Sequence, residues 1–350
     1  TTRLEKAGVA LVFALALVPS WLLYFFGFRT LDDYLDANSW HAHEMVFGFG
    51  MAVIAGFLLT AVGNWTQRET LIGAPLLALA ALWVLGRMAM LWARHLPFAL
   101  PALVDLAFLP LLITALARPL IATRNRRNYP LLALLSALCV CNGLVHAQAL
   151  GLLPLGSARR ACLLAIDMVL LVVLIITGRV LPMFTRNATQ ATDVRSSTVL
   201  DRACLASMVV LAVSDAAWPQ CALAIIAAGL TALLAAARAW SWGAQHTLRQ
   251  PLLWVLHAGY LWIVLGLGLR ALAGLGRVPG SLATHALTVG VIGTLTLGMM
   301  ARVALGHTGR LLDTSRSMVA AFYAINLAAA ARALLPWLIP SWQLPSLWLA

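Results

Sequence analysis

Long apolar runs separated by short polar segments make up almost the whole chain. A helix that spans a membrane needs about 20 mostly apolar residues, and eleven stretches of about this length occur along the sequence. They are residues 7–26, 42–63, 74–92, 97–117, 130–150, 161–184, 200–217, 219–238, 251–272, 281–305 and 315–335. A further apolar run starts near residue 340, where we expect part of a truncated twelfth span. The pattern predicts an all-α, polytopic transmembrane helical bundle that forms a single domain over residues 1–350.

The composition supports a membrane protein and excludes several other classes. Hydrophobic residues make up 62% of the 350 residues and charged residues only 10%, whereas a soluble domain has roughly 45–50% and about 25%. The net charge of +12 would suggest a nucleic-acid partner in a soluble protein. Here the arginines fall between apolar runs, so we expect the lipid bilayer and no nucleic acid as their partner. The five cysteines lie inside apolar runs without a CxxC pair, which favours buried structural thiols.

The basic residues also indicate an orientation. If the N-terminus is cytoplasmic, sixteen of the 24 Lys and Arg residues fall on the inner side and eight on the outer side. Cytoplasmic loops carry an excess of Lys and Arg, so the count predicts a cytoplasmic N-terminus. In this count Arg87 belongs to the outer loops and Arg238 to the inner loops.

Four carboxylates lie within or at the edges of the apolar runs. They are Glu44, Asp105, Asp167 and Asp215. A charge inside a bilayer costs several kcal/mol unless it is paired, so such residues are candidates for function. We predict that Glu44 and Asp167 carry protons in a catalytic role.

The histidines give the most informative pattern. In the predicted orientation, four lie at the outer ends of spans, one lies inside the ninth span, and one follows the tenth span on the inner side. In that order they are His41, His43, His146 and His285, then His257, then His307. Neutral imidazole is a common ligand of haem iron, copper and zinc, so we predict that at least two of them bind a metal; the alternative is a hydrogen-bonded structural role. His41 and His43 point roughly 200° apart on a helix and cannot share one ion.

An arginine-rich segment is predicted at the inner face. We expect Pro182 to break its helix, with Arg179 and Arg186 on either side of the kink, and His307 to meet them there. Together with Arg302 and Arg310, these arginines would hold either haem propionates or lipid phosphates. Glycines are frequent in 259–268 and 290–298, which suits either close helix packing or a flat prosthetic group.

Several motifs are missing from the sequence. It contains no Walker A pattern, no GxGxxG and no GxSxG, which argues against ATP-driven transport, nucleotide chemistry and a serine hydrolase within this chain. H-E-x-x-H is also absent, which disfavours a zinc protease. The absence of C-x-x-C-H excludes covalent attachment of a c-type haem.

Three stretches together resemble the NnrS family of bacterial membrane proteins. The first is WHAHEMVFGF at 40–49, continued by AGFLLTAV at 55–62 and NWT at 64–66; the second is GRVLPMFTRN at 178–187. The third begins with HALTVG at 285–290 and runs through MAR at 300–302 to LGHTGR at 305–310. Their order and spacing match the family over nearly the whole chain, although Gly63 stands where a proline is expected.

This resemblance implies a multi-pass protein of the bacterial inner membrane with about twelve helices and with haem and copper as cofactors. We take the haem to be haem b. The family is linked to nitric oxide, both in denitrification and in defence against nitrosative stress. His43, His285 and His307 match the positions most expected to serve the metals, followed by His41, His146 and His257.

Three functions remain open from the sequence. The first is a haem and copper protein that binds or turns over nitric oxide, including as a redox enzyme with an electron donor still to be identified. The second is a transporter, or a haem- or metal-handling factor that supports respiratory or denitrification enzymes. The third is a sensor or assembly partner of other respiratory proteins.

Overall fold

The computed structural model describes residues 19, 21–23, 34–307 and 312–339. Within these residues every regular element is a helix, in agreement with the predicted all-α class. In chain order the helices of the first half are α2 (Ala37–His43), η1 (Glu44–Gly50), α3 (Met51–Thr66), α4 (Gly73–Leu91), η2 (Ala93–His95), α5 (Leu100–Ala122), η3 (Arg126–Asn128), α6 (Tyr129–Ala149) and α7 (Ser157–Thr189). The second half has α8 (Thr198–Ala217), α9 (Ala222–Trp240), η4 (Ala244–Thr247), α10 (Pro251–Gly274), α11 (Gly280–His285), η5 (Ala286–Gly293), α12 (Thr294–His307), α13 (Arg316–Ala333) and α14 (Leu335–Leu338).

Nine helical segments in the described part of the chain are long and apolar enough to cross a membrane. They correspond to nine of the eleven predicted spans, so the chain is a multi-pass membrane protein. The predicted span at 200–217 is helix α8, which falls outside the nine because Asp201, Arg202 and Asp215 place three charges in it. The predicted span at 7–26 and the start of a twelfth near 340 lie outside the described residues, except for residues 19 and 21–23.

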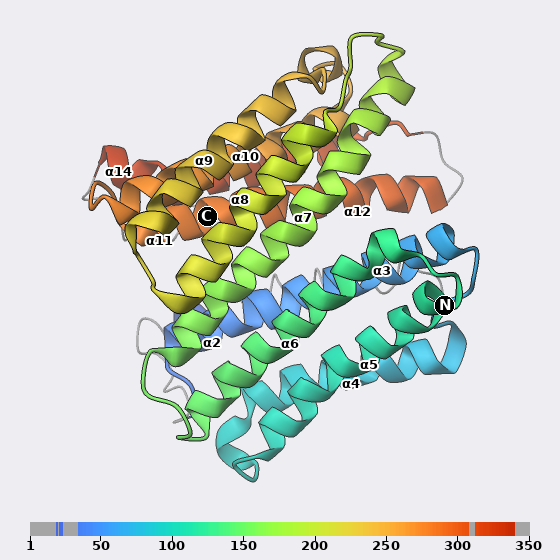
Figure 1. The fold of residues 1–350 in the computed structure, drawn as a ribbon. Coiled ribbons are helices and arrows are strands. Elements are labelled where there is room, and N and C mark those ends of the chain that lie inside the picture. Colours follow the sequence, from blue (N-terminus) through green and yellow to red (C-terminus); the bar gives the residue numbers. More distant parts are fainter. Residues whose placement is uncertain (1–18, 20, 24–33, 308–311, 340–350) are drawn as a thin grey trace. The chain divides into compact units, whose positions relative to one another are not determined.

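The chain forms two compact units, Thr1–Val169 and Leu170–Ala350, and the boundary falls inside α7. In Figure 1 the first unit runs from blue to green and the second from green to red. In the first unit α5 packs against α3, α4 and α6. Its core includes Leu112, Leu135, Leu138 and Val145, which are completely buried. These apolar contacts hold the helices that carry the polar residues described below.

Two segments of the membrane helices in the described part of the chain are π-helices. One, η1, directly follows His43, and the other, η5, directly follows His285. A π-helix has i→i+5 hydrogen bonds, is rare, and frequently occurs at functional sites. In η1 the indole Nε1 of Trp83 donates a hydrogen bond to the carbonyl of Gly48 at 2.9 Å, which satisfies one backbone group of this irregular turn.

The glycine-rich runs of the second unit serve close helix packing. A Cβ added to Gly266 would lie 2.5 Å from Leu287 Cδ2, and one added to Gly290 would lie 2.6 Å from the Trp262 ring. Helices α10 and η5 therefore approach too closely there for any larger residue. Of the two roles open from the sequence, packing is the one seen at these positions.

The prediction that Pro182 breaks its helix is wrong. Helix α7 continues through this proline to Thr189. Proline removes only one backbone donor, and membrane helices tolerate it because neighbouring helices and Ser or Thr side chains satisfy the freed groups.

Candidate metal centre in the first unit

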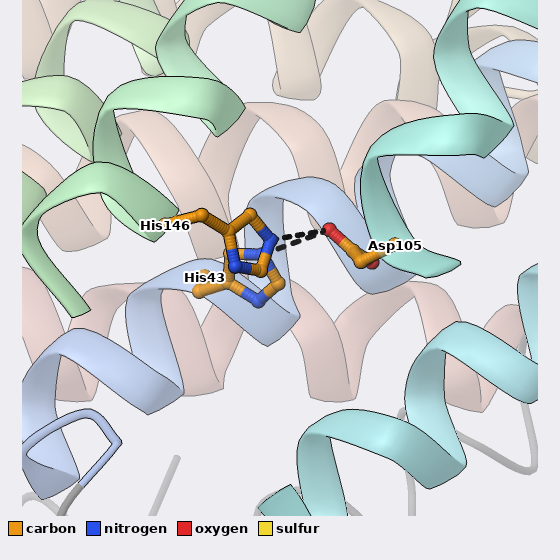
Figure 2. A group of neighbouring side chains, drawn as sticks. All are labelled: His43, Asp105 and His146. Atoms are coloured by element: carbon orange, nitrogen blue, oxygen red, sulfur yellow. Dashed lines mark hydrogen bonds and ion pairs between the residues drawn. The ribbon is translucent and has the colours of Figure 1, made fainter. Parts of the chain in front are cut away.

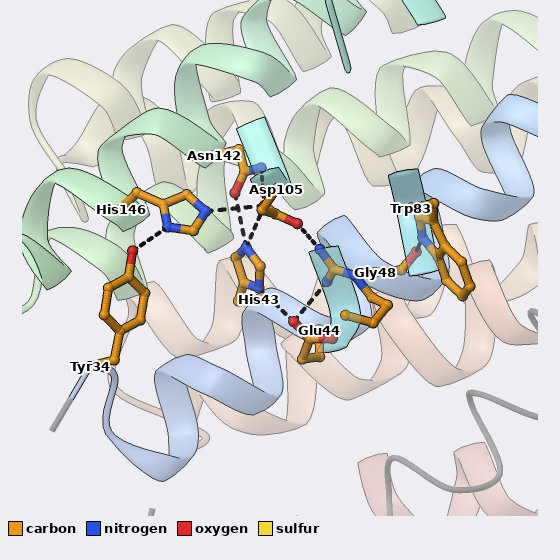
Figure 3. Close-up of polar contacts among 9 residues, drawn as sticks. Tyr34, His43, Glu44, Gly48, Trp83, Asp105, Asn142 and His146 are labelled. Atoms are coloured by element: carbon orange, nitrogen blue, oxygen red, sulfur yellow. Dashed lines mark hydrogen bonds and ion pairs between the residues drawn. The ribbon is translucent and has the colours of Figure 1, made fainter. Parts of the chain in front are cut away.

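Five helical elements of the first unit, of which α2 and η1 are continuous, bring buried polar side chains to one place (Figure 3). His43 ends α2 and Glu44 begins η1, so a single turn supplies both. Arg87 comes from α4 and Asp105 from α5. Helix α6 contributes Asn142 and His146, which are four residues apart and so share one face. None of these side chains is more than 5% exposed.

Two imidazole rings point at the same carboxylate oxygen (Figure 2). His43 Nε2 lies 3.3 Å from Asp105 Oδ2, and His146 Nε2 lies 3.0 Å from the same atom. The other nitrogen of each ring is also held. His43 Nδ1 is 2.9 Å from Glu44 Oε1, and His146 Nδ1 is 2.8 Å from the hydroxyl of Tyr34. His43, Asp105 and His146 each offer one ligand atom, and these atoms lie within 4.8 Å of one another.

The hydrogen bonds around His43 leave a group of acceptors facing each other. A carboxylate only accepts, so His43 Nδ1 donates its hydrogen to Glu44 and a neutral ring has a lone pair at Nε2. This Nε2 faces Asn142 Oδ1 at 3.0 Å as well as Asp105 Oδ2. The Asn142 amide group is already oriented, because its Nδ2 donates to Asp105 Oδ2 at 2.7 Å. A proton, on the ring or on Asp105, or a metal ion is therefore needed among the three acceptors.

The charges of the site lead to the same requirement. Arg87 pairs with Glu44 Oε1 at 2.7 Å through Nη1 and with Asp105 Oδ1 through Nη2. One guanidinium thus faces two carboxylates, and with both imidazoles neutral the buried site has a net charge of −1. A buried charge without a partner is strongly unfavourable, so the site favours one additional cation.

A cavity of about 10 Å³ borders the site between Trp83, Arg87, Asp105 and Asn142. This is about the space of a single water molecule. The Nε of Arg87 is buried beside it without a hydrogen-bond partner among the described residues. The site therefore has room next to it for a water molecule or a ligand of similar size.

Tyr34 lies at the edge of the site, just before the start of α2. Only 6% of the residue is exposed. Burial raises the pKa of Tyr34 to about 12, so its hydroxyl stays protonated next to His146 at neutral pH.

Comparison with protein-family models identifies the family of the chain. The family model described as NnrS protein matches residues 9–350. The chain belongs to the NnrS family. No curated protein matches the sequence at a significant level. Membership of the NnrS family points to a membrane protein of the nitric oxide response, in agreement with the resemblance carried by its three motifs.

In this NnrS family member, the candidate residues of the first unit separate into two groups. His43, His146 and Glu44 meet in the site, whereas His41 and Asp167 are not part of the three-residue group. The ring of His41 instead lies 4.6 Å from the ring of Trp21. Asp167 is fully buried in α7. The two-residue spacing of His41 and His43 thus does separate their side chains.

The candidate residues of the second unit lie on several helices. His285 Nδ1 donates to the carbonyl of Ser281 at 2.7 Å, and His257 Nε2 lies 3.0 Å from Thr185 Oγ1. The Arg302 guanidinium stacks on the ring of Phe184 at 4.0 Å. In the described part of this unit, no three ligand-bearing side chains come together as they do around Asp105.

The predicted arginine cluster of this NnrS family member is described only in part. Arg179 is half-buried and Arg186 is exposed, both on the last turns of α7. The side chain of His307 and the whole of Arg310 lie outside the described residues. Binding of haem propionates or of lipid phosphates therefore stays a prediction.

Four residues of the site, Tyr34, Arg87, Asp105 and Asn142, were not among the predicted site residues. Asp105 was recognised as a membrane carboxylate, but its place between two histidines depends on the packing of α5 with α6. Arg87 was wrongly assigned to an outer loop, and Arg238 to an inner one. Both are buried in helices, at 5% and 2% exposure. Without Arg238 the inner count of basic residues falls by one, and without Arg87 the outer count falls by one. The excess of basic residues on the inner side therefore remains. The position of Arg87 inside an apolar run was the signal that could have identified it.

Proposed function

We propose that His43, His146 and Asp105 bind a metal ion, and that this protein uses the ion together with haem b to bind or turn over nitric oxide within the membrane. The observation that carries the proposal is the convergence of two imidazole Nε2 atoms on one carboxylate oxygen of Asp105, with the Asn142 amide oxygen also facing His43 Nε2, in a site of net negative charge. Such an arrangement is stabilised by a cation.

The donor atoms fit copper. Imidazole suits copper, zinc and iron, and copper is the ion that the family resemblance implies. Each ligand histidine is held by a hydrogen bond at its other nitrogen, His43 Nδ1 by Glu44 and His146 Nδ1 by the Tyr34 hydroxyl; with a metal at Nε2, each Nδ1 would be the donor. This is the usual second layer of a metal site. A copper ion held there would supply one-electron chemistry and a coordination position for a small ligand.

The other residues of the site position these ligands. Glu44 fixes the His43 tautomer that leaves Nε2 free, and Arg87 holds both Glu44 and Asp105 in place. The adjacent cavity, about the size of one water molecule, would admit a diatomic ligand but no larger substrate.

Haem does not fit among these residues, because the polar side chains of the cluster are in direct contact with one another. For the haem we propose His285 as a ligand. Its Nδ1 is bonded to the Ser281 carbonyl, so a neutral ring presents the lone pair of Nε2. Helix α13, which carries Arg332, packs against α11 and brings a cation to the same region.

The experiment is metal analysis and absorption spectroscopy of the purified full chain and three variants. We expect H43A and H146A to lose copper at least tenfold while keeping the haem Soret band, and H285A to lose haem while keeping copper. The exposed residue His95 provides the matched control, and H95A should keep both. Normal copper content in both H43A and H146A would refute the metal site. Copper that is present but exchanges freely with an added chelator would favour the metal-handling function instead.

A further inference from the structure

The second unit contains an apolar cavity of about 890 Å³ that no residue of the proposed metal centre lines. Its walls come from the end of α9, from η4, from the first turns of α10, and from α13. Most of the lining is aliphatic or aromatic. The polar side chains in it are His257, Gln245, Thr247 and Tyr323. Its size is within the range of about 300–1,000 Å³ that is typical of small-molecule sites.

The cavity has an aromatic wall. The rings of Trp254 and Tyr323 lie 5.0 Å apart, and Phe322 packs edge-on against Trp254 at 6.1 Å. Trp240, at the end of α9, is 90% exposed beside it. Helices α9, α10 and α13, which line the cavity, are each part of a segment long and apolar enough to cross a membrane, so a ligand dissolved in the bilayer would have a route to it. Stacked rings of this kind suit a planar aromatic ligand.

The hydrogen bond of His257 defines which chemical group the cavity can bind. The Thr185 hydroxyl uses its hydrogen on the Leu181 carbonyl, so it must accept at the 3.0 Å contact with His257. Nε2 therefore carries the hydrogen and Nδ1 has the lone pair. Among the described residues Nδ1 has no hydrogen-bond partner. His257 thus offers an acceptor in an apolar cavity, and the matching ligand has a hydroxyl donor.

We propose that this cavity binds a lipid-soluble quinol, with one ring hydroxyl donating to His257 Nδ1 and the ring stacked against Trp254 and Tyr323. An acyl chain has no donor for Nδ1. A haem whose iron is bound to His257 Nδ1 would collide with the helix backbone, because Nδ1 is next to Cγ, the ring carbon attached to Cβ. A quinol satisfies the acceptor, the aromatic wall and the route through the bilayer.

The test is equilibrium binding of decylubiquinol and of its dimethyl ether to the purified full chain in detergent. The ether keeps the ring and tail but has no hydroxyl donor. One hydrogen bond contributes about a factor of ten, so the wild-type protein should bind the quinol about tenfold more tightly than the ether. His257→Phe should bind both equally at the weaker affinity. Ala258→Trp, which fills the cavity, should bind neither, and H95A should behave as wild type.

Equal binding of the two probes to the wild-type protein would overturn the proposal, as would unchanged binding to Ala258→Trp. Loss of the haem Soret band from His257→Phe would also overturn it, because haem would then be the occupant. Copper content is measured on the same samples. It reports on the first unit alone, so failure here is distinguishable from failure of the metal centre.

Discussion

Each unit buries an arginine in its helices, and the two arginines have different surroundings. In the first unit Arg87 faces two carboxylates and two histidines. In the second unit Arg238 pairs with one carboxylate, that of Asp201, at 2.8 Å. Its other contacts include neutral groups: the Leu174 carbonyl, the hydroxyl of Tyr260 and the ring of Trp242.

The difference distinguishes a structural ion pair from a binding site. Around Arg238 the charges cancel and the donors meet acceptors, so nothing further is needed. Around Asp105 the charges do not cancel and acceptors face one another, so a further proton or a metal ion is needed. Burial of a charge is therefore less informative than the balance of charge and of hydrogen-bond donors around it.

Replacing each arginine by methionine should give the largest effect and separate the two cases. Removing one partner of a buried ion pair costs about 3–5 kcal/mol, so R87M and R238M should both unfold at lower temperature than the wild type. In R87M the site has an additional negative charge, and added copper should restore much of the lost stability. Thermal unfolding with and without copper measures this. Equal rescue of R238M, or no rescue of R87M, would contradict the comparison.

Glu44→Gln should give the next largest effect. The substitution keeps the size of the side chain and removes the charge that holds the His43 Nδ1 hydrogen. Losses of this kind typically reduce metal affinity about 10–100-fold. Competition with a copper chelator measures the affinity, and Glu69→Gln at an exposed position is the control. An affinity equal to that of the control would mean that Glu44 does not orient the ligand.

Gly178→Ala probes the packing around Arg238. A Cβ at this position would overlap Nη2 of Arg238, so the ion pair must shift. We expect a loss of about 1–3 kcal/mol, typical of overpacking. The matched control is Gly56→Ala in α3, where an added Cβ meets nothing within 4 Å. There the better helix propensity of alanine should stabilise by about 0.5–1 kcal/mol. Thermal unfolding of both variants decides whether Gly178 is required for Arg238.

The smallest effect is expected at Asp193, in the loop after α7. A hydrogen bond from His246 at 2.9 Å holds the pKa of Asp193 below its ordinary value. A lowered pKa in the folded state adds stability above the ordinary pKa, and this contribution disappears as the pH falls through the lowered value. Asp193→Asn should therefore reduce Tm slightly at pH 6, and the difference should shrink as the pH falls through the lowered pKa of Asp193. A difference that does not shrink at acid pH would exclude this hydrogen bond as its cause.

The helices could be predicted from the sequence because a membrane requires long apolar runs. Nine of these runs are found as spans, and His43, Glu44 and His146 were predicted site residues. Which residues meet could not be read in the same way. Asp105 and His146 are 41 positions apart and come together only through the packing of α5 against α6.

The errors have local causes. Arg87 was counted with the loops because charge alone was used to place it, although it lies in an apolar run. Pro182 was predicted to break its helix, as it would in a water-exposed helix where no neighbouring helix satisfies the freed backbone groups. The two π-helices had no signal in the sequence, because an i→i+5 bond pattern needs no particular residue type.

These π-helices have a consequence for what each helix can present to its neighbours. A wider turn accommodates one residue more than an α-helix would, so the segments before and after it are out of phase by about 100°. His43 can therefore face the buried carboxylate while the apolar stripe of α3 keeps its own packing direction. Deleting a single residue within Glu44–Gly50 would restore a regular spiral, and it would turn either the imidazole or the stripe away from its place.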